Sequence, residues 1–115
     1  MKEGDVVLAQ VPQADRQPKN RPAIVLREMP PFRDFLVCGI SSRLHLRVES
    51  FDELISPDDV DFPSSGLLSP SLVRLGFLTV LSRKSVLGSI GSIAPERHQR
   101  LLRTLSGHLV ADLAS

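Results

Sequence analysis

Short apolar segments rich in β-branched residues alternate with polar or proline-containing breaks along the first third of the chain. Three segments have the composition of a strand: Asp5–Val11, Pro22–Arg27 and Phe35–Ser41. The polar Pro12–Asn20 stretch predicts a loop, and Met29–Phe32 predicts a break because proline cannot donate to a ladder. We therefore expect three strands in this third of the chain.

The segment Leu44–Glu49 alternates strictly between apolar and polar residues. This period of two predicts a half-buried edge strand with its three apolar residues facing the core. It also places His45 on the polar face, at even spacing from Ser41. The acidic Ser50–Leu68 stretch, interrupted by prolines, predicts a long excursion with one helical turn at Phe51–Ile55.

The last third of the chain changes from strand patterning to helix patterning. Phe77–Leu81 and Val86–Ile90 predict two more strands, and Gly88 is expected to mark a bulge. From Pro95 onward leucines recur at helical spacing, and proline suits the first position of a helix. The arginines of that helix are expected off its apolar stripe: Arg97, Arg100 and Arg103. Many short strands and one helix predict a mainly β (α+β) fold, a small barrel or curled sheet capped by a C-terminal α-helix.

Length and composition indicate a single domain spanning residues 1–115. Hydrophobic residues make up 42% of the chain, enough for one core, and the single cysteine, Cys38, excludes an intrachain disulfide. No apolar run approaches the roughly 20 residues that a membrane helix needs. The acidic N-terminus is unlike a signal peptide. We therefore expect a soluble, cytoplasmic protein with no membrane partner.

The charge is unevenly distributed although the net charge is only +1. Eleven of the 14 basic residues are arginine, and none of them lies between Val48 and Val73. That stretch holds a run of acids: Asp52, Glu53, Asp58, Asp59 and Asp61. Arginine presents paired donors to phosphate, so a separate arginine-rich side could hold RNA, although solvated charge is the commoner reason for such a pattern.

Five segments, taken in order, resemble the MazF/PemK toxins. They are Gly4–Leu8, Asn20–Leu26, Gly39–Ser42, Ser65–Leu68 and Ile90–Glu96. The resemblance covers nearly the whole chain in order and spacing. It implies an SH3-like barrel with a C-terminal helix, a symmetric homodimer, and the toxin of a type II toxin–antitoxin system. It further implies sequence-selective cleavage of single-stranded mRNA without metal or other cofactor, by attack of the ribose 2′-hydroxyl, and an antitoxin that blocks the site.

The resemblance also assigns candidate catalytic residues. Arg21 matches the family's catalytic arginine, which would neutralise the phosphate as negative charge builds on it in the transition state. Ser41 matches the family's Thr or Ser at the end of the third strand, and its hydroxyl would donate to the phosphate. Ser42 could serve instead, because a shift of one residue in register exchanges the faces of a strand.

The general base is where this chain departs from the family pattern. Members often carry an acidic or other polar residue about five positions before the arginine, where this chain has Arg16. Gln17 fits that pattern, and the neighbouring Asp15 is the candidate base. Ser69 and Ser71 stand where some members have an arginine and an aspartate. These departures leave open a slower enzyme, a different base, or a barrel that has lost catalysis.

Other polar residues near the candidate catalytic pair are expected to contact RNA: Gln17, Lys19, Ser42, Arg43 and His45. For His45, an exposed edge position without a role is the alternative. Among the aromatic residues, only Phe32 in the Pro-Pro-Phe loop looks free to stack on a base. No metal site is expected, since His98 and His108 have no cysteine or paired carboxylate near them, and the acidic loop is expected to be solvated.

Two other functions compete with the nuclease. Gyrase-inhibiting toxins of the CcdB kind share the barrel but act through a C-terminal Trp-Gly-Ile ending, whereas this chain ends Ala111–Ser115 without any tryptophan. The second alternative is a catalytically silent barrel that binds RNA or an antitoxin without cutting.

Overall fold

The computed structural model describes residues 1–11 and 19–111, and it contains six strands and two helices. The strands are β1 (Asp5–Val11), β2 (Lys19–Met29), β3 (Asp34–Ser41), β4 (Glu53–Ile55), β5 (Ser71–Leu81) and β6 (Val86–Ser92). The helices are α1 (Phe62–Ser65) and α2 (Pro95–Leu109), and single 3₁₀ turns occur at Leu44–Leu46 (η1) and Arg83–Ser85 (η2). The mainly β (α+β) prediction with a C-terminal helix is therefore confirmed. Among the described residues, no helix has the length and apolar character needed to span a bilayer.

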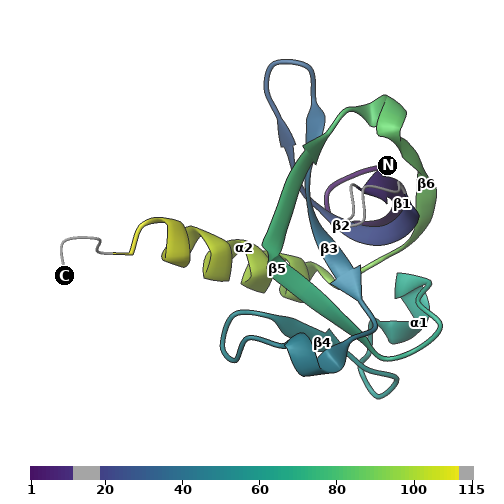
Figure 1. Ribbon diagram of the computed structural model, residues 1–115, viewed down its shortest axis with the longest axis vertical. Helices are drawn as coiled ribbons and strands as arrows, with labels where there is room; N and C mark the ends of the chain where they lie inside the picture. Colours follow the sequence, from purple (N-terminus) through teal and green to yellow (C-terminus); the bar gives the residue numbers. More distant parts are fainter. Residues whose placement is uncertain (12–18, 112–115) are drawn as a thin grey trace.

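All six strands belong to one antiparallel sheet in the order β4-β5-β3-β2-β1-β6. Figure 1 shows that the sheet curls strongly, while α2 passes beneath β5 and extends beyond the sheet. Within the described residues the two edge strands, β4 and β6, do not pair with each other. The sheet is thus an open curl rather than a closed ring of strands.

The curl has an apolar cluster on each face, as strand alternation requires. One cluster lies between the sheet and α2 and includes Val6, Ile24, Cys38, Leu101 and Leu105. The other lies inside the curl: Val7, Ala9, Ala23, Val25, Phe35, Val37, Leu81 and Val86. Both faces of β1, β2 and β3 are therefore buried, which explains why these strands read as nearly continuous apolar runs. The prediction that Cys38 belongs to the core is confirmed.

The strand predictions for the apolar segments are confirmed with shifted boundaries. β5 begins at Ser71 instead of Phe77, because Val73 and Leu75 also pack into the core. β6 pairs with β1 through two irregularities, and its pairs Ser89↔Val7 and Gly88↔Leu8 lie between them. The bulge expected at Gly88 is thus present beside that residue.

The prediction of an edge strand at Leu44–Glu49 is wrong. This segment contains η1, and every residue in it is exposed, including Leu44, Leu46 and Val48. The reason lies in the tertiary pairing, because β5 is already bonded to β3 on one side and to β4 on the other. No edge of β5 is left for this alternating segment.

The helical turn predicted at Phe51–Ile55 is also wrong, since Glu53–Ile55 forms β4 against β5. The buried Asp52 carboxylate fixes this edge by accepting hydrogen bonds from the backbone N–H groups of Val48 and Leu75. The single helical turn of the acidic stretch is α1, which ends at Gly66 in the left-handed conformation, φ +75°. A glycine is favoured there because a side chain strains this backbone conformation.

The C-terminal helix begins at Pro95 as predicted, but its two faces differ from the prediction. Leu101 and Leu105 are buried, whereas Leu109 is 67% exposed where α2 leaves the sheet. Arg97, expected off the apolar stripe, is buried with a relative exposure of 7%. The leucine expected at 113 lies outside the described residues.

Candidate active site

An open pocket of about 290 Å³ lies where the middle of β1, the start of β2 and the end of β3 meet the segment that joins α1 to β5. Its lining combines apolar side chains, serines and one arginine: Leu8, Arg21, Pro22, Ile40, Ser41, Ser42, Gly66, Leu67, Leu68, Ser69, Ser71 and Ile90. The structure thus brings Arg21, Ser41 and Ser42 to one pocket. It also brings there most of the segment around Gly66, which lies far from Arg21 in sequence.

Arg21 lies near the start of β2, where it pairs with Ala9 of β1. Its side chain is exposed, and among the described residues no carboxylate is within ion-pair distance of its guanidinium. The rigid position comes from the antiparallel pairs on either side, Asn20↔Gln10 and Pro22↔Leu8. A fixed, unneutralised cation at a pocket is suited to binding a phosphate oxygen.

Ser41 is the last residue of β3 and is half-buried at the pocket. Its Oγ accepts a hydrogen bond of 3.0 Å from the backbone N–H of Arg43. Because this contact uses a lone pair of the hydroxyl, the proton of Ser41 is left to donate. The β2–β3 register runs through Ile24↔Cys38 and Ala23↔Gly39. Continued by two residues, that register places Arg21 opposite Ser41.

The other serines of the pocket differ in what their hydroxyls can do. Ser42 and Ser69 are exposed at the pocket, whereas Ser71 is buried and donates its hydroxyl to the Ser69 carbonyl at 2.9 Å. Ser71 therefore fixes the turn that enters β5. Ser42 and Ser69 are the additional hydroxyls available to a ligand.

One wall of the pocket depends on close contact between α1 and β6. A Cβ atom on Gly66 would collide with the carbonyl of Ile90, and one on Gly91 would collide with the carbonyls of Ser64 and Ser65. The Ser64 hydroxyl also donates to the Ser92 carbonyl at 3.1 Å. The two glycines let these backbones touch, and the next residues, Leu67 and the 98% exposed Leu68, form the rim.

A buried ion-pair network holds this wall to α2. The Arg97 guanidinium donates to Asp61 through Nε at 2.7 Å and Nη2 at 3.1 Å, and it also reaches Glu53 and Asp59. Burial alone would raise the pKa of Asp61, but hydrogen bonds from Arg97 and the Ala94 N–H hold it below its usual value. Asp61 immediately precedes α1, so Arg97 anchors the turn that ends at Gly66.

This network was missed by sequence reasoning and corrects it in one respect. Asp59 and Asp61 were expected to be solvated, yet both pair with Arg97, and Glu53 pairs with Arg97 and Arg100. Among the described residues, no group of three His, Cys, Asp or Glu side chains is arranged to hold a metal ion. No local sequence pattern predicts the network, because its charged residues are far apart along the chain, on β4, before α1 and on α2.

The remaining predicted site residues that the structure describes are not part of the pocket lining. Lys19, Arg43 and His45 are exposed and do not line it. His45 is part of η1, so its expected strand alignment with Ser41 is wrong. Asp15 and Gln17 lie outside the described residues. His98 bonds the Leu26 carbonyl through Nε2 at 2.8 Å and fixes α2 to β2.

Fold and pocket together define a small curled-sheet protein with one arginine and several hydroxyls around an open, largely apolar pocket. A family profile described as PemK-like, MazF-like toxin of type II toxin-antitoxin system matches residues 2–109. The chain therefore belongs to the PemK/MazF-like toxin family. A comparison with curated proteins gave no match.

Solved structures share this fold over nearly the whole chain. Mycobacterium tuberculosis toxin MazF-mt6 superposes with a TM-score of 0.69 at 18% identity, covering 94% of this chain and 98% of that one. An endoribonuclease in complex with its cognate antitoxin, from a mycobacterial species, gives a TM-score of 0.67 at 14% identity. That match covers 97% of both chains. At these identities the similarity establishes the fold.

Proposed function

We propose that this toxin-family protein is an endoribonuclease that cleaves single-stranded RNA in a sequence-selective manner, without a metal, through attack of the ribose 2′-hydroxyl. The observation that supports the proposal most directly is the convergence of Arg21 and Ser41 on one pocket. Family membership supports the same activity, because toxins of this family are generally endoribonucleases.

The proposed roles follow from the chemistry of the pocket. The 2′-oxygen bonds to phosphorus, the bond from phosphorus to the 5′-oxygen breaks, and the products are a 2′,3′-cyclic phosphate and a 5′-hydroxyl that takes its proton from water. As the attack proceeds, negative charge builds on the non-bridging oxygens, and the Arg21 guanidinium neutralises that charge. The Ser41 hydroxyl donates its free proton to one of these oxygens and holds the phosphate in line with the attacking group. Both groups are carried by paired strands, so little reorganisation is needed during the reaction.

The base that removes the 2′-hydroxyl proton remains assigned to Asp15. The described lining of the pocket holds no carboxylate or histidine. The segment that carries Asp15 and Gln17 joins the paired residues Val11 and Lys19, two positions from Arg21. We assign RNA contacts to Gln17, Lys19, Ser42, Arg43 and His45, of which only Ser42 lines the pocket.

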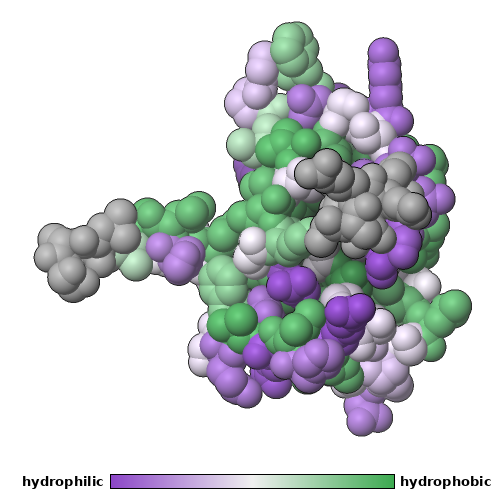
Figure 2. Space-filling model, in the orientation of Figure 1, coloured by the Kyte–Doolittle hydropathy of each residue, from purple (hydrophilic) through white to green (hydrophobic). Residues whose placement is uncertain are grey.

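A homodimer and an antitoxin complete the proposal. Figure 2 shows apolar surface over the upper part of β5 and along the projecting end of α2. Exposed apolar residues lie on both elements and just after α2: Leu78, Val80, Leu109 and Val110. We assign this surface to the contact between two copies, which would form a shared groove for RNA. An antitoxin that fills the groove and covers Arg21 is supported by the structurally similar endoribonuclease, which is solved with its cognate antitoxin.

The test is fluorogenic RNA cleavage by the purified chain, with and without EDTA. We expect cleavage to survive EDTA and to fall at least about a hundredfold in Arg21→Ala, because a fixed donor to the transition state is lost. Arg103→Ala, which removes an exposed arginine on α2, is the matched control and should cut like the wild type. Cleavage that stops in EDTA, or that persists in Arg21→Ala, contradicts the proposed mechanism.

The absence of any acid or histidine from the described lining favours one other function, a catalytically silent protein of this fold that binds RNA or an antitoxin without cutting. The same assay separates the two. Binding of single-stranded RNA with no cleavage under any condition supports the silent protein, whereas EDTA-resistant cleavage excludes it.

A further inference from the structure

Phe77 packs against the backbone of β3 at Gly39, with the Cδ1 edge of its ring nearest to the strand. A Cβ atom built on Gly39 would lie only 2.8 Å from the Cδ1 of Phe77 and 3.5 Å from its Cε1. The missing side chain at Gly39 is therefore what allows the ring to rest on the strand. Phe77 as a residue is 42% exposed and belongs to neither apolar cluster of the core.

An irregularity in the pairing of β5 with β3 directs the Phe77 ring towards Gly39. The β3–β5 ladder passes from Cys38↔Leu78 directly to Gly39↔Arg74, so Leu75, Gly76 and Phe77 have no partners on β3. Such extra residues bend a strand and redirect its side chains. Leu75 turns into the core, while Phe77 turns onto Gly39.

A cation accompanies the ring. The guanidinium carbon of Arg74 lies 5.5 Å from the centre of the Phe77 ring, within the range of a cation–π interaction. Among the described residues, no carboxylate forms an ion pair with Arg74. An exposed ring beside an arginine without an acidic partner is suited to a ligand that has both an aromatic face and a negative charge.

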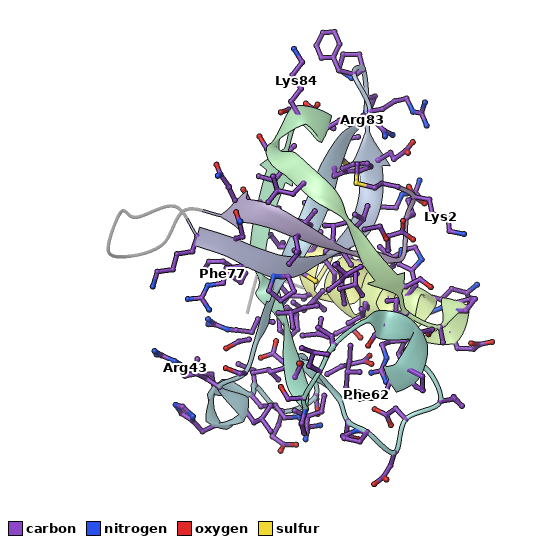
Figure 3. The ribbon with its side chains drawn as sticks, turned by 90° about the vertical axis from the view of Figure 1, so that its right-hand side faces the viewer. Lys2, Arg43, Phe62, Phe77, Arg83 and Lys84 are labelled. Atoms are coloured by element: carbon purple, nitrogen blue, oxygen red, sulfur yellow. The ribbon has the colours of Figure 1, made fainter. Side chains whose placement is uncertain are left out.

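The ring and the candidate catalytic pair lie on the same face of the sheet. Gly39 pairs with Ala23 on β2 and with Arg74 on β5. Ser41 and Arg21 each lie two residues further along their strands, on the same face and about 7 Å away along the strand. Figure 3 shows Phe77 on the side of the molecule that also carries Arg43, and Lys2 on the opposite side.

We propose that Phe77 and Arg74 form a stacking platform for one nucleobase of single-stranded RNA, next to the phosphate held by Arg21 and Ser41. This inference rests on the proposed function and adds a subsite to it. The base stacks on the Phe77 ring, and the Arg74 guanidinium contacts the flanking phosphate. A nucleic acid is favoured over an apolar protein partner because the platform carries a positive charge of its own.

The platform also replaces the stacking residue expected from the sequence. Phe32 is 79% exposed, but it lies at the tip of the β2–β3 hairpin, beyond the pair Met29↔Asp34. Seven residues of strand separate Asp34 from Ser41, about 23 Å at the usual rise. Figure 1 shows this hairpin at the end of the sheet opposite to α1, which borders the pocket.

The test measures binding of the full chain to short 2′-O-methyl RNA of random sequence, which lacks the attacking hydroxyl and is not cut. Phe77→Leu should bind about 5- to 150-fold more weakly, the range expected for one lost base–aromatic stack. Phe77→Tyr and Phe32→Leu should retain wild-type affinity. In RNA that contains 2-aminopurine, the wild type and Phe77→Tyr should quench the fluorescence of the stacked base, and Phe77→Leu should not.

Gly39→Ala provides a second route that keeps the phenyl group. Its added methyl group displaces the ring, so it should weaken RNA binding in the wild-type background and have no further effect in Phe77→Leu. Thermal melts identify any variant that fails to fold, and sedimentation reports the number of copies in the assembly.

Three results would overturn the platform. If Phe77→Leu binds like the wild type while Arg21→Ala loses affinity, the platform is wrong and the proposed function stands. If Phe77→Leu changes only the sedimentation behaviour, the ring belongs to a protein contact. If the wild type neither binds nor cuts RNA, the platform and the proposed function fail together.

Discussion

At the scale of single residues, the candidate site depends on which lone pairs and protons are already in use. Ser41 and Ser71 both line the pocket, but their hydroxyl groups differ. The Ser71 hydroxyl donates its proton to the Ser69 carbonyl, whereas the Ser41 hydroxyl accepts a hydrogen bond from the Arg43 N–H, so its own proton is not used. Residue type alone could not separate them. The hydrogen bonds of the folded chain identify Ser41 as the donor available to a phosphate.

We expect Ser41→Ala to lower kcat about 10²- to 10³-fold, as for loss of one donor to a transition-state oxyanion. Ser41→Thr keeps the hydroxyl and should retain most activity. Steady-state cleavage kinetics with a fluorogenic RNA provide the measurement, and Ser71→Ala serves as the comparison for a serine whose proton is committed. A Ser41→Ala enzyme with wild-type kcat would remove this serine from the mechanism.

At the scale of elements, α2 does more than cover the sheet. Its first turn carries Arg97, which holds Asp61 at the start of α1, while His98 bonds the Leu26 carbonyl of β2. The helix thus fixes the wall of the pocket that includes Gly66 and Leu67. The helix itself was predictable from its leucine spacing, but the role of Arg97 was not, because its acidic partners lie about 36 to 44 residues earlier.

Arg97→Met should destabilise the fold by about 3–5 kcal/mol, because it leaves Asp61 buried without its partner. The double variant Arg97→Met/Asp61→Leu should recover part of that loss, since it removes the uncompensated charge. Urea unfolding of the wild type, both variants and Asp61→Leu gives the four unfolding free energies of a double-mutant cycle. Equal stability of Arg97→Met and the wild type would show that the pair makes no net contribution.

At the scale of the whole molecule, the curl of the sheet decides both stability and site. Curling buries one face of β1, β2 and β3 inside the curl and the other beneath α2. Antiparallel pairing places the end of β3 beside the start of β2, and the tertiary fold brings both to the α1–β5 segment. The stability of the folded chain therefore depends on the ion pairs that hold these distant segments together.

The pH dependence of unfolding should show how much these ion pairs stabilise the fold. The pKa of folded Asp61 lies below its ordinary value of 3.8, so the folded state favours the ionised carboxylate. The stabilisation is fully present above the unfolded pKa and is lost as the pH falls below about 4 towards the folded pKa. Thermal melts between pH 7 and pH 3 should show a fall in Tm that is smaller in Asp61→Asn. An equal fall in both proteins would contradict this assignment.

Sequence alone determined the local elements of this protein. Apolar runs fixed β1, β2, β3 and β6, and leucine spacing fixed α2, because burial of one or both faces imposes a period that can be read along the chain. The order of five short segments also pointed to the family. The pairing of strands could not be predicted from this local periodicity, as the alternating Leu44–Glu49 segment demonstrates.

Only the tertiary structure decided where strands pair and which side chains meet. It placed β4 instead of Leu44–Glu49 beside β5, paired buried Arg97 with distant acids, and turned Phe77 onto Gly39 through an irregularity in β5. These outcomes depend on contacts between residues far apart along the chain. Local periodicity carries no information about such contacts, because it records how much of a segment is buried but not what buries it.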